Sequence, residues 1–121
     1  MKKILVVDDE QAVCNMLKKF LSNKGYETII ALSGEEAIIK VKEEKPHVVL
    51  LDIKMPKMDG LEALKRIKEI DKEVGVVMIT AVKDEEMGKK CLELGAYDYI
   101  TKPLPLDYLE SVLLIKLLDF K

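Results

Sequence analysis

The sequence predicts an α/β fold, a single (βα)5 domain in which one doubly wound parallel sheet has helices on both faces. Apolar runs of strand length alternate five times with stretches whose apolar residues recur at helical spacing. The connections between them are short, which favours right-handed crossovers between parallel strands. The chain has 121 residues, 49% of them hydrophobic and 35% charged, which suits one compact core rather than two. We therefore expect one domain over residues 1–121.

The first two strands and their helices follow from local patterns. Lys3–Val7 contains the continuous apolar run Ile-Leu-Val-Val, which is typical of a strand buried on both faces. The helix after it should stop at Gly25, and the second strand should span Tyr26–Ala31. Ser33 begins a capping box for the second helix, which should run to about Lys45, before Pro46. The apolar face of the first helix comprises Val13, Met16, Leu17, Phe20 and Leu21.

The remaining elements are predicted in the same way. Val48–Leu51 is the third strand, and a loop rich in turn formers leads from it to a helix with Leu61, Leu64 and Ile67 on one face. The expected fourth strand, fourth helix and fifth strand are, in order, Val74–Ile79, Asp84–Leu94 and Tyr97–Ile100.

The last helix should begin at Leu106, with Pro105 near its first turn. One stripe of this helix should face the core, and it comprises Leu106, Leu109, Leu113, Leu117 and Phe120. Leu114, Ile115 and Leu118 fall outside that stripe. Such residues often mark a contact surface, although harmless apolar residues at a fraying end are the alternative.

Polar side chains stand where four of the five strands end. Asp8 and Asp9 follow the first strand, Asp52 the third, Thr80 the fourth and Lys102 the fifth. In the flavodoxin-like strand order 2-1-3-4-5, the first and third strands are neighbours where the order reverses, and ligands bind there. We therefore expect three carboxylates to converge, with a hydroxyl and an ammonium group beside them.

This set of groups predicts a particular chemistry. Three close carboxylates repel one another unless a cation offsets their charge, and all-oxygen ligands select Mg²⁺, for which Mn²⁺ can substitute. A lysine and a hydroxyl beside such an ion suit a phosphoryl group, and a carboxylate can be the nucleophile. Asp52, at the centre, is the candidate. Judged singly, each residue is equally well a turn, cap or surface residue, and only their conjunction favours one site.

Four segments carry a resemblance to a known family: "ILVVDDE", "VVLLDIKMPKMDG", "VVMITA" and "LGAYDYITKP". From Lys2 to about Leu118 the chain resembles the receiver domain of two-component response regulators, which are signalling switches. The resemblance implies that Asp52 is the phosphoacceptor, served by a sensor histidine kinase or a phosphotransfer protein. It also implies that the Lys102–Pro103 peptide bond is cis.

The resemblance assigns the other site residues as well. Mg²⁺ would be bound by Asp9, Asp52 and the main-chain carbonyl of Lys54, with Asp8 acting directly or through water. Thr80 and Lys102 would bind the phosphoryl oxygens. Thr80 and Tyr99 would form the switch, in which Tyr99 swings inward when Thr80 moves.

The chain departs from the usual pattern of that family at several positions. Lys57 stands where relatives often have glycine. Lys54 and Val82 occupy the two positions that tune dephosphorylation, and neither has a carboxylate or an amide to position water, so self-dephosphorylation should be slow. Gly88 lowers the stability of the fourth helix and suits it to shift, unless it marks close packing. We accordingly expect an acceptor that assists its own phosphorylation, not an enzyme.

Two further classes of protein share part of this pattern of residues. A haloacid-dehalogenase-type enzyme also uses a nucleophilic aspartate with Mg²⁺, but it would need an Asp-x-Asp pair at the first strand and a capping insertion. An interaction module that has lost phosphorylation would not need the intact acids, Thr80 and Lys102. The lone histidine, His47, lies at the wrong end of the sheet for a phosphocarrier and is expected to be structural.

Partners and location are expected from charge, cysteines and the resemblance. The net charge of −2 gives no reason to expect nucleic acid contact by this domain or membrane binding. Without a recognisable secretion signal, a cytoplasmic location and reduced Cys14 and Cys91 are expected. A homodimer through the fourth helix, fifth strand and fifth helix is implied by the resemblance. The chain is expected to be free-standing or the N-terminal part of a larger regulator, such as a transcriptional one.

Overall fold

Five parallel strands form a single sheet in the computed structural model, which describes residues 2–118. The strands are β1 (Lys3–Val7), β2 (Glu27–Ala31), β3 (Val48–Leu51), β4 (Gly75–Thr80) and β5 (Asp98–Thr101). Their order is β2-β1-β3-β4-β5, which confirms the predicted fold class and strand order. The register pairs Val7 with Leu51 and Thr80 with Thr101, so the carboxyl ends of neighbouring strands lie level.

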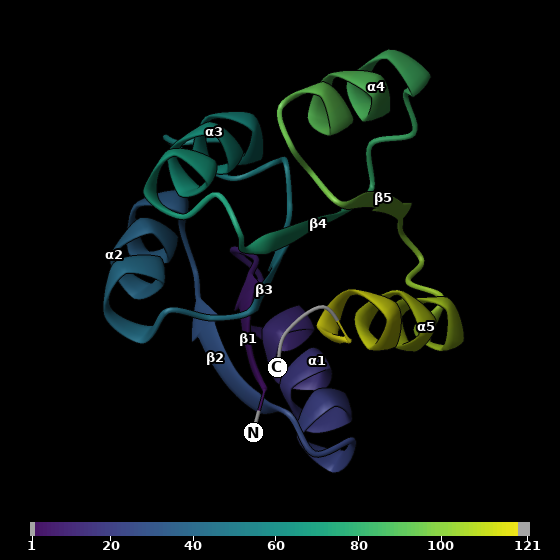
Figure 1. The fold of residues 1–121 in the computed structure, drawn as a ribbon. Helices are drawn as coiled ribbons and strands as arrows, with labels where there is room; N and C mark the ends of the chain where they lie inside the picture. The colour runs from purple at the N-terminus through teal and green to yellow at the C-terminus, as the bar shows by residue number, and fades with distance from the viewer. Residues whose placement is uncertain (1, 119–121) are drawn as a thin grey trace.

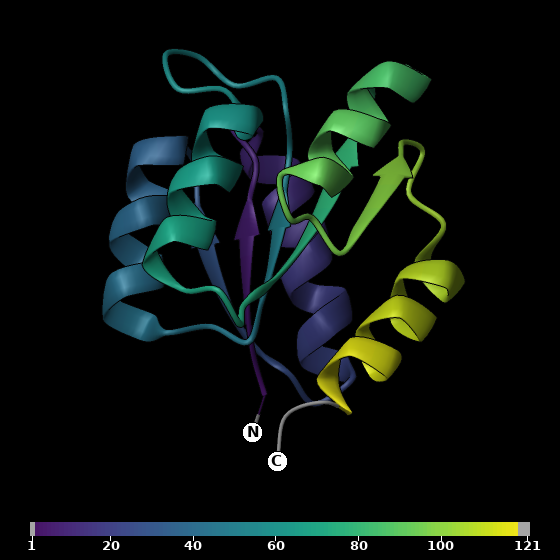
Figure 2. The same ribbon diagram turned by 45° about the horizontal axis from the view of Figure 1, so that its top comes forward.

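Helices cover both faces of the sheet (Figure 1). They are α1 (Gln11–Asn23), α2 (Gly34–Glu44), α3 (Gly60–Ile70), α4 (Glu85–Glu93) and α5 (Leu106–Leu117). Helices α1 and α5 lie on one face, and α2, α3 and α4 lie on the other (Figures 1 and 2). No helix within residues 2–118 is long and apolar enough to cross a membrane.

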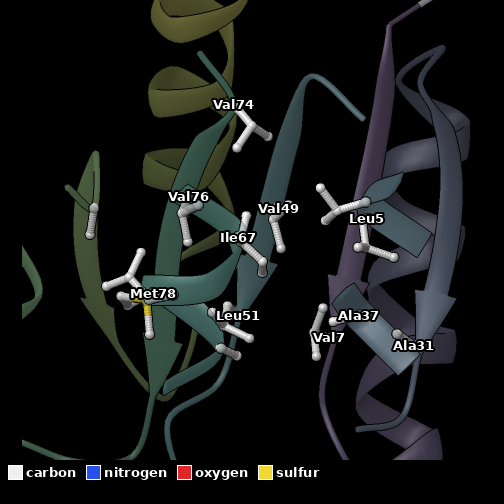
Figure 3. Close-up of a cluster of buried hydrophobic side chains, with 14 of the residues drawn as sticks. Leu5, Val7, Ala31, Ala37, Val49, Leu51, Ile67, Val74, Val76 and Met78 are labelled. Carbon is white, nitrogen blue, oxygen red and sulfur yellow. The ribbon is translucent and has the colours of Figure 1, made fainter. Parts of the chain in front are cut away.

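The core consists of two apolar clusters separated by the sheet. Alternate strand residues point to opposite faces, so Leu5 and Val7 belong to the cluster under α2 and α3, whereas Ile4 and Val6 belong to the cluster under α1 and α5. Figure 3 shows the first of these clusters. Cys91 lies in the first cluster and Cys14 in the second; both are buried free thiols, as expected.

Local capping explains where α2 begins and ends. The Ser33 hydroxyl accepts a hydrogen bond from the Glu36 N–H at 3.1 Å, so the predicted cap is present. The Glu36 carboxylate accepts from the Leu32 N–H at 2.6 Å, one residue before the cap itself. The residue after the helix, Lys45, caps it in the left-handed conformation with φ 48°, immediately before Pro46. The Lys102–Pro103 bond is cis.

Three strands differ slightly from their predicted bounds. Strands β4 and β5 each lie one residue later than predicted, and β2 begins at Glu27. The prediction followed the apolar residues, whereas the hydrogen-bonded ladder continues through the polar residues Thr80 and Thr101. Thr80 is therefore the last residue of a strand, where its backbone is held by the sheet.

The predicted face of α5 is largely correct. Leu109, Leu113 and Leu117 are buried, and Val112, which was left out of the predicted stripe, is buried with them. Leu106 is only half-buried because it stands at the first position of the helix. The predicted core role of Phe120 lies outside the described residues. Outside the stripe, the exposed fractions are 54% for Leu114, 60% for Ile115 and 78% for Leu118.

Candidate functional site

Three carboxylates meet at the carboxyl ends of β1 and β3. Oxygen atoms of Asp8, Asp9 and Asp52 all lie within 4.8 Å of one another. Asp8 and Asp52 are buried, with exposed fractions of 3% and 6%, whereas Asp9 is exposed. Because β1 and β3 are neighbours in register, residues 44 positions apart in the chain become adjacent here. The all-oxygen donor set fits a hard divalent cation such as Mg²⁺.

Lys102 provides the positive charge nearest to the buried acids. Its Nζ lies 2.9 Å from Asp8 Oδ2 and 3.3 Å from Asp52 Oδ2. Partial burial by itself lowers the pKa of Lys102, but the hydrogen bond from Lys102 to Asp8 and the charges of Asp52 and Asp8 outweigh it and raise the pKa. The ammonium group therefore stays charged between the two acids.

Main-chain N–H groups fix the other oxygen of each buried acid. The Glu10 N–H donates to Asp8 Oδ1 at 3.0 Å, and the Ile53 N–H donates to Asp52 Oδ1 at 2.7 Å. Each carboxylate thus has one oxygen held by the backbone and one directed toward Lys102. Hydrogen bonds to ionised carboxylates are among the stronger ones, so both side chains have a defined orientation.

Cys14 supports the main chain beneath the site. Its buried thiol donates to the carbonyl oxygen of Asp8 at 3.4 Å. Burial, and then the charge of Asp8, raises the pKa of Cys14 to about 11, so the thiol keeps its proton and remains a donor.

Val82 links the two predicted switch residues. Its N–H donates to the hydroxyl of the fully buried Thr80 at 3.2 Å. Its carbonyl accepts from the Tyr99 hydroxyl at 2.6 Å. Burial, followed by the charges of nearby groups including Asp84, raises the pKa of Tyr99, so the phenol is a donor. The hydroxyls of Thr80 and Tyr99 are therefore connected through one residue.

The predicted residues fall into two groups. Most of the predicted site residues line one open cleft of about 340 Å³: Asp9, Asp52, Lys54, Thr80 and Lys102. Glu10 and Ala81 complete the lining of this cleft. Asp8 does not line this cleft, but it forms an ion pair with Lys102, which does. Tyr99 lies outside this cleft and lines a neighbouring hollow with Gly88 and Thr101. The predicted metal-binding role of the Lys54 carbonyl stays a prediction.

Sequence reasoning missed the groups that act through the main chain. The N–H groups of Glu10 and Ile53 orient the acids, and both polar groups of the Val82 peptide backbone bind switch residues. Every residue type except proline has these groups, so no sequence signal distinguishes the ones that are used.

His47 lies at the opposite end of the sheet from the acids. Its Nδ1 accepts from the Lys3 main-chain N–H at 3.0 Å, and the main-chain N–H of His47 donates to the Lys3 carbonyl at 2.8 Å. This reciprocal pair joins the beginnings of β1 and β3 and supports the structural interpretation of His47.

Comparison with known proteins gives one consistent family. The family model described as the response regulator receiver domain matches residues 4–114 of the sequence. The alkaline phosphatase synthesis transcriptional regulatory protein PhoP of Bacillus subtilis is 48% identical over 84% of this chain and 42% of its own length. The sporulation initiation phosphotransferase F of Bacillus subtilis is 41% identical over 88% of this chain and 86% of its own length. The chain thus spans less than half of PhoP.

Solved structures agree with this family. The CheY-like receiver domain protein of Methanospirillum hungatei JF-1 has a TM-score of 0.90 and 34% identity, with 96% of this chain and 94% of that chain covered. The chain matched in the CheX–CheY–BeF3–Mg²⁺ complex of Borrelia burgdorferi has a TM-score of 0.88 and 39% identity, with 94% of this chain and 88% of that chain covered.

Proposed function

Because the chain belongs to the family of response regulator receiver domains, which act in phosphorylation-dependent two-component signalling, we propose that its phosphoacceptor is Asp52. Receiver domains are signalling switches rather than classical enzymes. The observation that carries the proposal is the buried Asp52 carboxylate, with one oxygen held by the Ile53 N–H and the other facing Lys102. The phosphoryl donor is the phosphohistidine of a sensor histidine kinase or a phosphotransfer protein, and the receiver comprises residues 1–121.

The acids are assigned to the cation that this transfer needs. Asp8, Asp9 and Asp52 supply carboxylate oxygens, and the Lys54 main-chain carbonyl is the further ligand, in a site that suits Mg²⁺ or, in its place, Mn²⁺. When bound, the ion would offset the repulsion among the acids and neutralise charge on the transferred group. The burial of Asp8 and the exposure of Asp9 support Asp9 as the more accessible ligand.

The transfer uses groups that already lie beside Asp52. Oδ2 of Asp52 attacks phosphorus, the P–N bond to the donor imidazole breaks, and its electron pair leaves with the imidazole, which takes up a proton from solvent. Lys102 Nζ and Thr80 Oγ1 bind the phosphoryl oxygens and are in this sense catalytic. Lys102 moves from the carboxylate to the phosphoryl group without losing its charge.

Phosphorylation then moves the switch residues. The new group has more charge and more acceptor oxygens than a carboxylate, so it draws the Thr80 hydroxyl toward itself. The Thr80 hydroxyl, whose oxygen accepts from the Val82 N–H, would donate its proton to a phosphoryl oxygen and in moving there would leave the Val82 N–H. Val82 also binds the Tyr99 hydroxyl, so this exchange repositions Tyr99 and the beginning of α4.

The output surface is assigned to α4, β5 and α5. These elements and the residue before β5 contain exposed apolar side chains, among them Leu92, Tyr97, Tyr108 and Ile115. We assign this surface to a phosphorylation-dependent homodimer or target contact in the cytoplasm, with no contact to nucleic acid or membrane by this domain. Sedimentation velocity over a concentration series, with and without beryllofluoride, tests it. A sedimentation coefficient that does not rise under either condition would exclude the dimer.

The phosphorylated state should be long-lived. Lys54 and Val82 have no carboxylate or amide to position an attacking water molecule, and the Val82 carbonyl is already bound by Tyr99. We predict slow loss of the phosphoryl group, and Lys54→Glu, which adds a carboxylate at the cleft, should shorten the half-life. A wild-type half-life of seconds would contradict this prediction.

Acetyl phosphate with Mg²⁺ tests the proposed function. Mass spectrometry should find one phosphoryl group on Asp52, and Asp52→Asn is the control that should gain none. Steady release of phosphate far beyond one equivalent would instead indicate a haloacid-dehalogenase-type enzyme. No mass gain under any condition would indicate an interaction module without phosphorylation.

A further inference from the structure

Gly60, the first residue of α3, packs against the main chain at the end of β3. It is buried, and its N–H donates to the Ile53 carbonyl at 2.7 Å. A methyl group at its Cα would overlap the carbonyl oxygen of Asp52 and lie 2.6 Å from the Cα of Ile53. Main-chain atoms cannot turn aside as a flexible side chain can. Only glycine therefore fits here without moving the end of β3.

The peptide group that Gly60 contacts also orients the Asp52 side chain. This peptide group joins Asp52 to Ile53, and its carbonyl oxygen, which belongs to Asp52, faces Gly60. Its N–H, which belongs to Ile53, donates to Asp52 Oδ1 at 2.7 Å. Because a peptide group is planar, displacing the carbonyl turns the N–H with it. A shift at Gly60 would therefore reach the Asp52 carboxylate through one rigid unit.

We propose that Gly60 is a positioning residue for the phosphoacceptor. By letting α3 begin directly against the 52–53 peptide group, it keeps the Ile53 N–H on Asp52 Oδ1 and leaves Oδ2 directed toward Lys102. The inference rests on the proposed role of Asp52 and adds a residue that touches neither the phosphoryl donor nor the cation.

Gly34 provides a matched control. It is the first residue of α2 and follows the cap Ser33 as Gly60 follows the cap Asp59. A methyl group at Gly34 would lie 3.0 Å from Cγ and Sδ and 3.1 Å from Cβ of Met58, so it meets side-chain atoms that need to give by only a few tenths of an ångström, and no main-chain atom. Alanine therefore changes helix propensity alike at both positions, but only at Gly60 does it press on the acceptor strand.

The test compares Gly60→Ala, Gly34→Ala and wild type in phosphorylation by acetyl phosphate with Mg²⁺, followed over time by mass spectrometry. The limiting rate at saturating acetyl phosphate should fall roughly tenfold to a hundredfold in Gly60→Ala and less than about twofold in Gly34→Ala. The Ile53 amide proton resonance should move upfield in Gly60→Ala alone, since its hydrogen bond is weakened. Equal rates and an unmoved Ile53 resonance in the two variants would overturn the proposal.

Two further outcomes are separable. If wild type is not phosphorylated at Asp52, the proposed function fails, and the Ile53 resonance still decides whether Gly60 positions the carboxylate. If Gly60→Ala does not fold, amide exchange in wild type decides. Ile53 should be protected although it lies outside every strand and helix, and Asp52→Ala should remove that protection. Free exchange of the Ile53 amide in wild type would refute the positioning role.

Discussion

Replacing Lys57 by glycine should stabilise the protein. Lys57 lies in the loop between β3 and α3 with φ 66°, a left-handed conformation that a side chain disfavours. This strain costs a non-glycine residue roughly 1–2 kcal/mol. Glycine also has more conformational freedom in the unfolded chain, and this opposes the stabilisation gained from relieving the strain by about 0.4–1 kcal/mol. The Lys57 side chain is exposed and makes no hydrogen bond or ion pair with any other residue of 2–118, so little else is lost.

The expected net gain is about 0.5–1 kcal/mol in the free energy of unfolding, or roughly 2–4 °C in Tm. Urea unfolding followed by circular dichroism measures it, and the m value should not change. Lys18→Gly is the control: Lys18 is exposed in the middle of α1, where glycine should cost about 1 kcal/mol. The two variants should therefore have opposite signs. If Lys57→Gly were as destabilising as Lys18→Gly, the strain argument would be refuted.

Three further predictions concern pH, α4 and Tyr99. Burial, and then the charge of Lys2, lowers the pKa of His47 in the folded protein. As the pH falls below about 6.5, His47 therefore becomes protonated more readily in the unfolded chain than in the folded one, which favours unfolding. The urea concentration at the unfolding midpoint should be constant above that pH and should decrease as the pH is lowered further. The decrease should be smaller in His47→Asn. Gly88→Ala adds a methyl group 3.7 Å from the Tyr99 ring and should increase hydrogen-exchange protection of α4; unchanged protection would count against it. Tyr99→Phe loses the 2.6 Å bond to Val82 and should cost about 0.5–1.5 kcal/mol in thermal unfolding.

The alternation of strands and helices was predictable because periodicity and capping are local properties. The runs at Lys3–Val7 and Val48–Leu51 and the cap at Ser33 are each visible within a few residues of sequence. General rules for parallel connections predicted the parallel strands and their crossovers but not the strand order, for which the flavodoxin-like order of this fold class was adopted and is confirmed. Given that order, the meeting of Asp8, Asp9 and Asp52 followed as well, because residues at the ends of neighbouring parallel strands must be close.

Only the tertiary structure decided how those residues are held. The left-handed backbone of Lys57 and the contact of Gly60 with the 52–53 peptide group depend on how the loop closes over β3. The connection of Thr80 to Tyr99 through Val82, and the place of Lys102 between Asp8 and Asp52, depend on packing between segments far apart in the chain. Main-chain groups supply several of these contacts, and they are the same in every residue but proline, so the sequence alone determined which side chains meet and the fold determined how they are oriented.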